Sequence, residues 1–267
     1  VGDWVVLRPH LNQNKANIHA ILNRKSKFIR KMAGKKTDEQ IIAANIDTIL
    51  IVSSLNNDFN VRRLERYLTQ VWDSGSNPVI ILNKIDLCDN VDKKIKEVEK
   101  IAFGVPIIAI SCVDRIGIEK LNNFLKEGET IALVGSSGVG KSTIINILMG
   151  KKVLKTKNIR EDDKGRHTTT HRELLILPSG AIIIDTPGMR ELQLWDEGEG
   201  ISGAFSDIKK LASQCKFTDC KHDTEPECAV KKAIEKGELS KKRYKSYQKM
   251  LRELRYLELK RAGKKVT

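Results

Sequence analysis

The sequence has 267 residues, of which 40% are hydrophobic and 31% are charged, and its formal net charge at pH 7 is +14. A chain of this length and composition can bury one sizeable core and still form one or two small modules, so we expect a folded protein of several domains. No apolar run approaches the roughly 20 residues of a membrane-spanning helix, and residues 1–10 lack the pattern of a signal peptide. We therefore expect a cytoplasmic protein with no membrane partner.

The positive charge lies at both ends of the chain. Residues 1–46 carry nine Lys and Arg against three Asp and Glu, residues 47–200 carry 21 against 22, and residues 201–267 carry 18 against nine. A near-neutral centre between basic ends is typical of a domain that acts on a small ligand while its flanks contact a polyanion. For either end alone, ordinary solvated lysines are an equally good explanation. These three ranges are the domains that we predict.

Residues 1–46 are expected to form a small β-domain. The short segments DWVVL, NIHAIL and EQIIAA have strand character, and NRKSKFIRK, between the second and the third, interleaves basic residues with one aromatic. A small β-barrel that binds RNA fits this pattern, and a β-domain without an RNA role is the alternative. Because the sequence does not begin with Met, we expect residues to precede Val1.

The central range predicts an α/β domain. Its apolar runs alternate with helical stretches, which indicates a mostly parallel, doubly wound sheet. The six predicted strands are 47–53, 79–82, 106–110, 130–134, 173–177 and 181–184.

An Asn-Lys-Ile-Asp motif follows the second predicted strand. Asn83 can bond to purine N7, the Lys84 stem can cover the ring, and the Asp86 carboxylate can accept from N1–H and N2–H₂ of guanine. Adenine would leave Asp86 facing a lone pair, at a cost of roughly 1 to 3 kcal/mol, which favours GTP over ATP. The motif alone is a weak match, but the third strand ends at Ser111 and Cys112, where a backbone amide could bind guanine O6.

A phosphate-binding loop follows the fourth predicted strand and opens a helix. The segment 135–142 fits the pattern G-x-x-x-x-G-K-[ST] in full, and its glycines let the backbone N–H groups turn towards phosphates. Lys141 should reach the β and γ phosphates, and the Ser142 hydroxyl should hold Mg²⁺. A glycine-rich turn without a ligand is the much weaker alternative. The predicted phosphate-side residues are Gly135, Ser136, Ser137, Gly138, Val139, Gly140, Lys141, Ser142 and Thr143.

The last predicted strand ends in an Asp-Thr-Pro-Gly turn. Asp185 would hold the magnesium ion through a water molecule, and the Gly188 amide would meet the γ-phosphate. A polar stretch before this strand could supply a threonine to Mg²⁺; Thr169 is preferred, and Thr168 and Thr170 remain open.

The base motif precedes the phosphate loop, which reverses the usual order of a Ras-like domain. The order fits a circular permutation, in which the original ends are joined and the chain is reopened after the Asp-Thr-Pro-Gly strand. Because chain ends commonly lie close together on the surface, such a change is tolerated. The segment around Gly188 then leads directly into the C-terminal module.

A cluster of cysteine and histidine predicts a structural zinc site in that module. Cys215, Cys220, His222 and Cys228 offer three thiolates and one imidazole at close spacing, and in a cytosolic chain a metal is favoured over a disulfide. Isolated free thiols are the alternative. Cys88 and Cys112 have no predicted metal role.

A C-terminal helix is predicted from Ser240, as its cap, to about Arg261. One face should pack against the protein, through Tyr244, Tyr247, Leu251, Leu254 and Leu257. The opposite face remains available for phosphate contacts, through Lys242, Lys245, Lys249, Arg252 and Arg255.

Over essentially its whole length the sequence closely resembles the RsgA (YjeQ) family of circularly permuted, ribosome small-subunit-dependent GTPases. The resemblance rests on the order NKID, GSSGVGKST, GRHTTTHREL and DTPGMRE, followed by the spacing of the cysteine and histidine cluster. It implies an N-terminal OB-fold, a permuted GTPase domain, a C-terminal zinc module and a role in late maturation of the small ribosomal subunit. The first domain is short for an OB-fold, so we expect it to be incomplete at its start.

Hydrolysis by the isolated protein is expected to be slow. Met189 stands where Ras-like enzymes carry a water-orienting Gln, and its side chain cannot orient water by hydrogen bonding. The resemblance implies that His167 acts instead, alongside Lys141 and Gly188, although a lone histidine in a polar loop is more often merely solvated.

Three functions compete on these observations. The first is a monomeric GTPase that uses Mg²⁺ and holds one Zn²⁺. The small ribosomal subunit and its rRNA stimulate its hydrolysis of GTP, which leads to release of the protein from the subunit. The second is a GTP-gated RNA placeholder whose hydrolysis only resets it. The third, a zinc-dependent DNA-binding ATPase, is disfavoured by Asp86.

Overall fold

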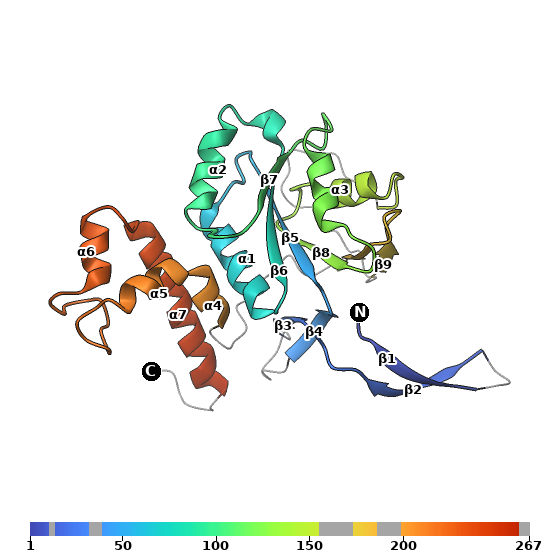
Figure 1. The fold of residues 1–267 in the computed structure, drawn as a ribbon, viewed down its shortest axis with the longest axis horizontal. Coiled ribbons are helices and arrows are strands. Elements are labelled where there is room, and N and C mark those ends of the chain that lie inside the picture. Colours follow the sequence, from blue (N-terminus) through green and yellow to red (C-terminus); the bar gives the residue numbers. More distant parts are fainter. Residues whose placement is uncertain (11–13, 32–38, 155–172, 186–198, 262–267) are drawn as a thin grey trace.

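The centre of the molecule is a six-stranded sheet (Figure 1) in the order β7-β6-β5-β8-β10-β9. All neighbouring strands pair in parallel except β9, which runs antiparallel to β10. The strands are β5 (Thr48–Ser54), β6 (Asn77–Asn83), β7 (Ile107–Ile110), β8 (Thr130–Val134), β9 (Glu173–Ile176) and β10 (Ile182–Asp185). The predicted mostly parallel sheet is confirmed. This computed structural model describes residues 1–10, 14–31, 39–154, 173–185 and 199–261.

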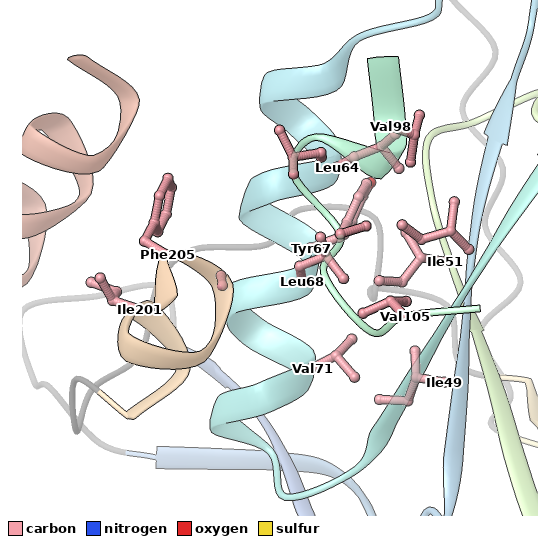
Figure 2. Packing of buried hydrophobic residues seen from close by; sticks show 14 of the residues in the cluster. Ile49, Ile51, Leu64, Tyr67, Leu68, Val71, Val98, Val105, Ile201 and Phe205 are labelled. Carbon is pink, nitrogen blue, oxygen red and sulfur yellow. The ribbon is translucent and has the colours of Figure 1, made fainter. Parts of the chain in front are cut away.

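The sheet is buried on both faces, which explains its continuous apolar strands. Along β5, Ile49 and Ile51 pack on the side of α1 (Val61–Asp73), with Leu64, Leu68 and Val71 of that helix (Figure 2). Burying each such side chain contributes about 1.5 to 3 kcal/mol. The alternate β5 residues pack on the opposite face against α3 (Lys141–Leu148).

Asparagine side chains cap the two helices on the first face. Asn60 accepts hydrogen bonds from the amides of Arg62 and Arg63 at the start of α1. Asn90 accepts from the Lys93 amide at the start of α2 (Val91–Glu99). Each cap satisfies amide groups that have no partner within the helix.

The N-terminal residues form two antiparallel pairs of strands. They are β1 (Val5–Pro9) with β2 (Ala16–Ile21), which projects away from the central sheet in Figure 1, and β3 (Lys27–Lys31) with β4 (Glu39–Ala44). Strand β3 was not predicted, because its sequence is mostly basic; Phe28 nevertheless joins the main core. In the part of residues 1–46 that the structure describes, these pairs are separate two-stranded sheets. The OB-type barrel stays a prediction.

The C-terminal residues are helical. The helices are α4 (Glu199–Ala204), α5 (Ser206–Ala212), α6 (Ala229–Glu235) and α7 (Lys241–Arg261). The predicted C-terminal helix is confirmed as α7, with the Ser240 carbonyl accepting its first hydrogen bond from the Tyr244 amide. The prediction that Leu251 packs inward is wrong, since it is 38% exposed, while Met250 and Arg243 are buried. None of the described helices has the length and apolar character that crossing a membrane requires.

A buried arginine joins the C-terminal helices to α1. Arg243 of α7 donates to Asp207 of α5 at 2.7 Å, to Glu65 of α1 at 2.9 Å and to the Ala204 carbonyl at 2.8 Å. Its guanidinium also lies over the Phe205 ring. The side chains of Arg243 and Glu65 are 4% and 0% exposed, so both charges need compensation by ion pairs, which Asp207 and Arg62 also supply.

Two further contacts reinforce this junction. Arg66 of α1 forms a two-bond ion pair with Glu253 of α7, at 2.9 and 3.1 Å. The Gly200 amide of α4 donates to Asp73 at 2.6 Å, and a Cβ at Gly200 would lie only 2.0 Å from the Thr69 carbonyl oxygen. In Figure 2, α1 therefore packs on the sheet with one side and on Ile201 and Phe205 with the other. The predicted domain boundaries themselves stay a prediction.

We expect Arg243→Ala to lower the free energy of unfolding by about 3 kcal/mol, because Glu65 would keep a buried charge with less compensation. Arg252→Ala, on the exposed face of the same helix, is the matched control and should change stability by less than about 0.5 kcal/mol. Urea titration followed by circular dichroism measures both. Equal stability of the two variants would contradict the structural role of Arg243.

Candidate nucleotide site and metal centre

Both predicted nucleotide motifs lie at one edge of the sheet. Strands β6 and β8 flank β5 and pair with it in parallel, so their carboxyl ends point the same way. Asn83 is the last residue of β6, and Gly135 follows the last residue of β8. The carboxyl edge of a parallel sheet is where such folds bind ligands. The reversed order in the chain therefore leaves the two motifs adjacent in space.

The phosphate loop approaches its neighbours closely at two glycines. Gly135 (φ 144°) and Gly140 (φ 106°) have backbone angles that side chains rarely adopt. A Cβ at Gly135 would lie 2.2 Å from the Val52 carbonyl oxygen, and a Cβ at Gly140 would lie 2.2 Å from Asn83 Nδ2. Glycine is thus required at both positions by backbone angle and by space. Ser137 and Gly138 form the exposed tip of the loop.

The lysine of the loop bonds to the loop itself. Lys141 Nζ donates to the carbonyl oxygens of Gly135 and Ser136, both at 2.6 Å. Lys141 is the first residue of α3, and these bonds hold its ammonium group within the curve of the loop. Ser142 and Thr143 follow in the first turn of this helix, where backbone amides lack partners within the helix.

Tyr67 is a neighbour of the loop that the sequence did not predict. It projects from α1, its side chain is buried, and it interacts with the side chain of Ser136. Burial raises the pKa of the Tyr67 hydroxyl, so it stays protonated at neutral pH. In the sequence Tyr67 lies on the apolar face of a helix, a position that indicates only core packing.

A side chain of the base motif holds the phosphate loop. Asn83 Nδ2 donates to the Val139 carbonyl oxygen at 2.8 Å, and the Asn83 side chain also interacts with the Cys112 thiol. Asn83 is 2% exposed, and its Oδ1 has no hydrogen-bond partner among the described residues. The two halves of the candidate site are therefore joined through one amide.

The rest of the base motif forms a tight turn. Lys84 adopts a left-handed conformation (φ 63°), and a short 3₁₀ helix, Ile85–Leu87, follows it. This turn presents the Asp86 carboxylate to Ser111, whose hydroxyl donates to Asp86 Oδ1 at 2.7 Å. The structure thus brings together the two base-side segments that the sequence analysis paired.

The segment after β7 closes this end of the site. Ser111 and Ile116 pair through their backbones, and Ser111 is fully buried. Burial raises the pKa of the Cys112 thiol to about 11, so this cysteine is a neutral thiol at physiological pH. Asp114, a residue that the sequence analysis did not select, also contacts the Ser111 hydroxyl, at 3.0 Å.

The predicted magnesium and catalytic residues are described in part. Ser142 lies in the first turn of α3, and Asp185 is the last residue of β10, which pairs with β8 beside the phosphate loop. The remaining predicted residues lie outside the described ranges, and their roles stay predictions. They are His167, Thr168, Thr169, Thr170 and Gly188; Met189, for which no catalytic role is predicted, lies outside the described ranges too.

The four predicted metal ligands come together between α5 and α6. The ligand atoms of Cys215, Cys220, His222 and Cys228 all lie within 4.8 Å of one another. His222 Nδ1 lies 3.3 Å from Cys228 Sγ and 3.5 Å from Cys215 Sγ, so Nδ1 is the nitrogen that faces the thiols. Burial lowers the pKa of His222, which favours the neutral imidazole that a metal requires.

Glu225 organises the loop that carries this cluster. Its carboxylate accepts hydrogen bonds from the amides of Lys221 and Asp223, at 2.8 and 2.9 Å. Backbone N–H groups, including its own, lower the pKa of Glu225 to about 2. His222 has a left-handed backbone (φ 59°), and its ring meets Tyr244 of α7 edge-on. The loop thus holds His222 towards the three cysteines and connects the cluster to α7.

Comparison with known proteins agrees with this geometry. The family model for the RsgA GTPase matches residues 21–195. Small ribosomal subunit biogenesis GTPase RsgA 1 of Oceanobacillus iheyensis is 52% identical over 100% of this chain and 77% of its own length. Small ribosomal subunit biogenesis GTPase RsgA of Methanosarcina acetivorans is 48% identical over 96% of this chain and 70% of its own.

Solved structures resemble the fold over nearly the whole chain. YjeQ from Thermotoga maritima aligns with a TM-score of 0.70 and 32% identity over 95% of this chain and 84% of that structure. YloQ, described as a circularly permuted GTPase, aligns with a TM-score of 0.67 and 27% identity over 96% and 80%. By sequence, fold and the reversed order of its motifs, the chain belongs to the RsgA family of circularly permuted P-loop GTPases.

Proposed function

We propose that this chain binds the small ribosomal subunit during its late maturation, hydrolyses GTP to GDP and phosphate when the subunit stimulates it, and is then released. The observation that carries the proposal is the hydrogen bond from Asn83 Nδ2 to the Val139 carbonyl, which joins a guanine-reading strand to a phosphate loop. Relatives that are about half identical over the whole chain are named as GTPases of small-subunit biogenesis. We further propose a cytoplasmic monomer.

The base is read by the loops after β6 and β7. Asp86 accepts from N1–H and N2–H₂ of guanine, the Lys84 stem covers the ring, and Asn83 donates its second Nδ2 hydrogen to N7. The Cys112 backbone amide binds O6, because the Ser111 amide already donates to the Ile116 carbonyl oxygen at 3.0 Å. The hydrogen bond from Ser111 to Asp86 supports this assignment, because it orients a carboxylate that is otherwise exposed.

The phosphates lie in the loop 135–143. Its backbone N–H groups and the first turn of α3 bind the phosphate oxygens, and Lys141 exchanges its bonds to the loop carbonyls for the β and γ phosphates. Ser142, Asp185 and Thr169 offer the hard oxygen ligands that Mg²⁺ prefers, and Ser142 and Asp185 belong to elements at the same sheet edge. Bound Mg²⁺ supplies positive charge that offsets the charge on the β and γ phosphates.

Hydrolysis depends on the segments that carry His167 and Gly188. The Gly188 amide meets the γ-phosphate, and His167 takes over the water-positioning role that Met189 cannot perform. Because the water-positioning role falls to His167 and not to the residue after Gly188, we expect slow GTP hydrolysis by the protein alone and strong stimulation by the subunit.

Basic surfaces at the ends of the chain bind the subunit's RNA. On α7 the five predicted basic residues, Lys242, Lys245, Lys249, Arg252 and Arg255, are all exposed, as a phosphate-binding face requires. Contacts of this kind release counterions, so raising salt should weaken subunit binding steeply. The same helix is tied to α1 through Arg243, which gives a physical link between this face and the GTPase domain.

The cysteine and histidine cluster holds one structural Zn²⁺. Three thiolates and one imidazole nitrogen within 4.8 Å are the donor set and the spacing that tetrahedral zinc takes. Cys215, Cys220, Cys228 and Nδ1 of His222 are the ligands. A bound ion would hold together the loop between α5 and α6, whose His222 ring contacts Tyr244 of α7.

We predict about one zinc per chain, and Cys220→Ser should lower zinc content and the thermal stability of the C-terminal helices while GDP affinity changes little. Cys88→Ser, which removes a thiol outside the cluster, is the control and should keep its zinc. Elemental analysis and circular dichroism provide the readouts. Zinc-free wild-type protein with an intact α7 would overturn the assignment.

Asp86→Asn should weaken GDP binding and improve the relative affinity for xanthosine diphosphate. The Asn amide can donate to the C2 carbonyl of xanthine, where guanine has an amino group that needs an acceptor. Competition titration against a fluorescent GDP analogue measures both affinities. An equal loss for both nucleotides would argue against direct base reading by Asp86.

The whole proposal is tested by GTP hydrolysis with purified small subunits, large subunits and naked RNA, in single-turnover and multiple-turnover conditions. Of these three additions, only small subunits should accelerate GTP hydrolysis by the protein. The His167→Ala variant should still bind GTP and small subunits but lose most of the stimulated rate. Affinity for subunits should be higher with a non-hydrolysable GTP analogue than with GDP. If small subunits did not stimulate GTP hydrolysis, the GTP-gated RNA placeholder would be the better explanation. If they stimulated His167→Ala as fully as the wild-type protein, the proposed role of His167 would be wrong.

A further inference from the structure

The Ser111 hydroxyl serves two carboxylates at once. Its oxygen lies 2.7 Å from Asp86 Oδ1 and 3.0 Å from Asp114 Oδ2, and it also accepts the Asp114 backbone N–H at 3.1 Å. A hydroxyl group has one hydrogen to donate and two lone pairs. The Asp114 amide occupies one lone pair, so the single hydrogen must be shared between two acceptors.

Solvent does not relieve this competition at the hydroxyl. Ser111 is fully buried and its backbone is fixed by the bridge to Ile116, so its Oγ cannot turn to water. Asp114 is held beside it through its own backbone amide, whatever its side chain does. When the hydrogen points to Asp114, Asp86 loses the bond that orients it and faces a lone pair of the serine oxygen.

We propose that Asp114 is an affinity-determining and specificity-determining residue, which weakens guanine binding by competing with Asp86 for the Ser111 hydroxyl. The inference rests on the proposed reading of guanine by Asp86. Asp114 acts through Ser111 and does not itself contact the base. It is therefore a positioning residue, and it weakens the orientation of Asp86 that the Ser111 hydroxyl provides. The functional consequence is faster intrinsic release of GDP.

Substituting Asp114 by Asn tests the competition with little change in shape. The Asn amide can donate to the Ser111 oxygen, which leaves the hydroxyl hydrogen to Asp86. Affinity for GDP should rise roughly two- to tenfold, the range expected for part of one hydrogen bond, and GDP release should slow by a similar factor. Asp114→Ala removes the competing carboxylate without adding a donor and should give a smaller gain.

Discrimination against xanthosine diphosphate separates this role from a general effect on the fold. A firmly oriented Asp86 should raise the ratio of GDP affinity to xanthosine diphosphate affinity, whereas a loop that is merely more stable would raise both affinities alike. Asp89→Asn, at an exposed carboxylate three positions after Asp86, is the charge-matched control and should leave the ratio unchanged.

The decisive measurement is a double-mutant cycle with Ser111→Ala, by stopped-flow GDP release and competition titration. Ser111→Ala should weaken GDP binding, and Asp114→Asn should have no further effect in its background. The proposal would be overturned if Asp114→Asn raised GDP affinity equally in the wild-type and Ser111→Ala backgrounds, or if Asp114→Asn alone did not raise GDP affinity. Asp86→Asn separates failure of the proposed base reading from failure of the proposed competition. If Asp86→Asn leaves GDP affinity unchanged, the base reading by Asp86 fails. If Asp86→Asn weakens GDP binding and Asp114→Asn leaves it unchanged, only the competition by Asp114 fails.

Discussion

The candidate nucleotide site depends on the hydrogen bond that Asn83 makes across the end of β5 to the carbonyl of Val139. It requires a polar side chain at the last residue of β6, a glycine at position 140 to leave room for it, and a common direction of β6 and β8 on either side of β5. Each requirement is met by a different part of the chain. Because the bond is buried, losing it would leave both the amide and the carbonyl unsatisfied, and such groups are costly in a protein interior.

Helix α1 is the second structural centre, because it contacts both the phosphate loop and the C-terminal helices. Tyr67 reaches Ser136 from the side that packs on the sheet, while Glu65 and Arg66, within the same turn, bond to Arg243 and Glu253 of α7. A shift of the phosphate loop that moves α1 must therefore also move or strain the junction with α7. The phosphate loop and α7, which carries the basic face, are therefore both joined to α1, so a path between them needs no long chain of intermediates.

Much of the fold and the site could be predicted because it depends on local patterns. The continuous apolar strands reflect burial on both faces, and the phosphate loop, the base motif and the ligand cluster are short, with fixed spacing. What could not be predicted depends on contacts between distant segments. Strand β3 is mostly basic and is a strand because it pairs with β4. Arg243 is one basic residue in a helix rich in Lys and Arg, and its burial depends on Glu65 and Asp207, which lie far away in the sequence. Asp114 lies beside Ser111 because the chain turns between Ser111 and Ile116.

The position of β5 between β6 and β8 has a consequence for synthesis of the protein. Its pairing with β6 is local, but the Thr130 amide at the start of β8 bonds to the Asp47 carboxylate 83 residues earlier in the chain. During translation, the half of the sheet from β5 to β7 is therefore complete while one edge of β5, a fully buried apolar strand, still lacks its neighbour. An unpaired edge of this kind is a template for aggregation, and closing so long a loop slows folding. The nascent chain therefore keeps this edge of β5 open until the phosphate-loop strand β8 has emerged.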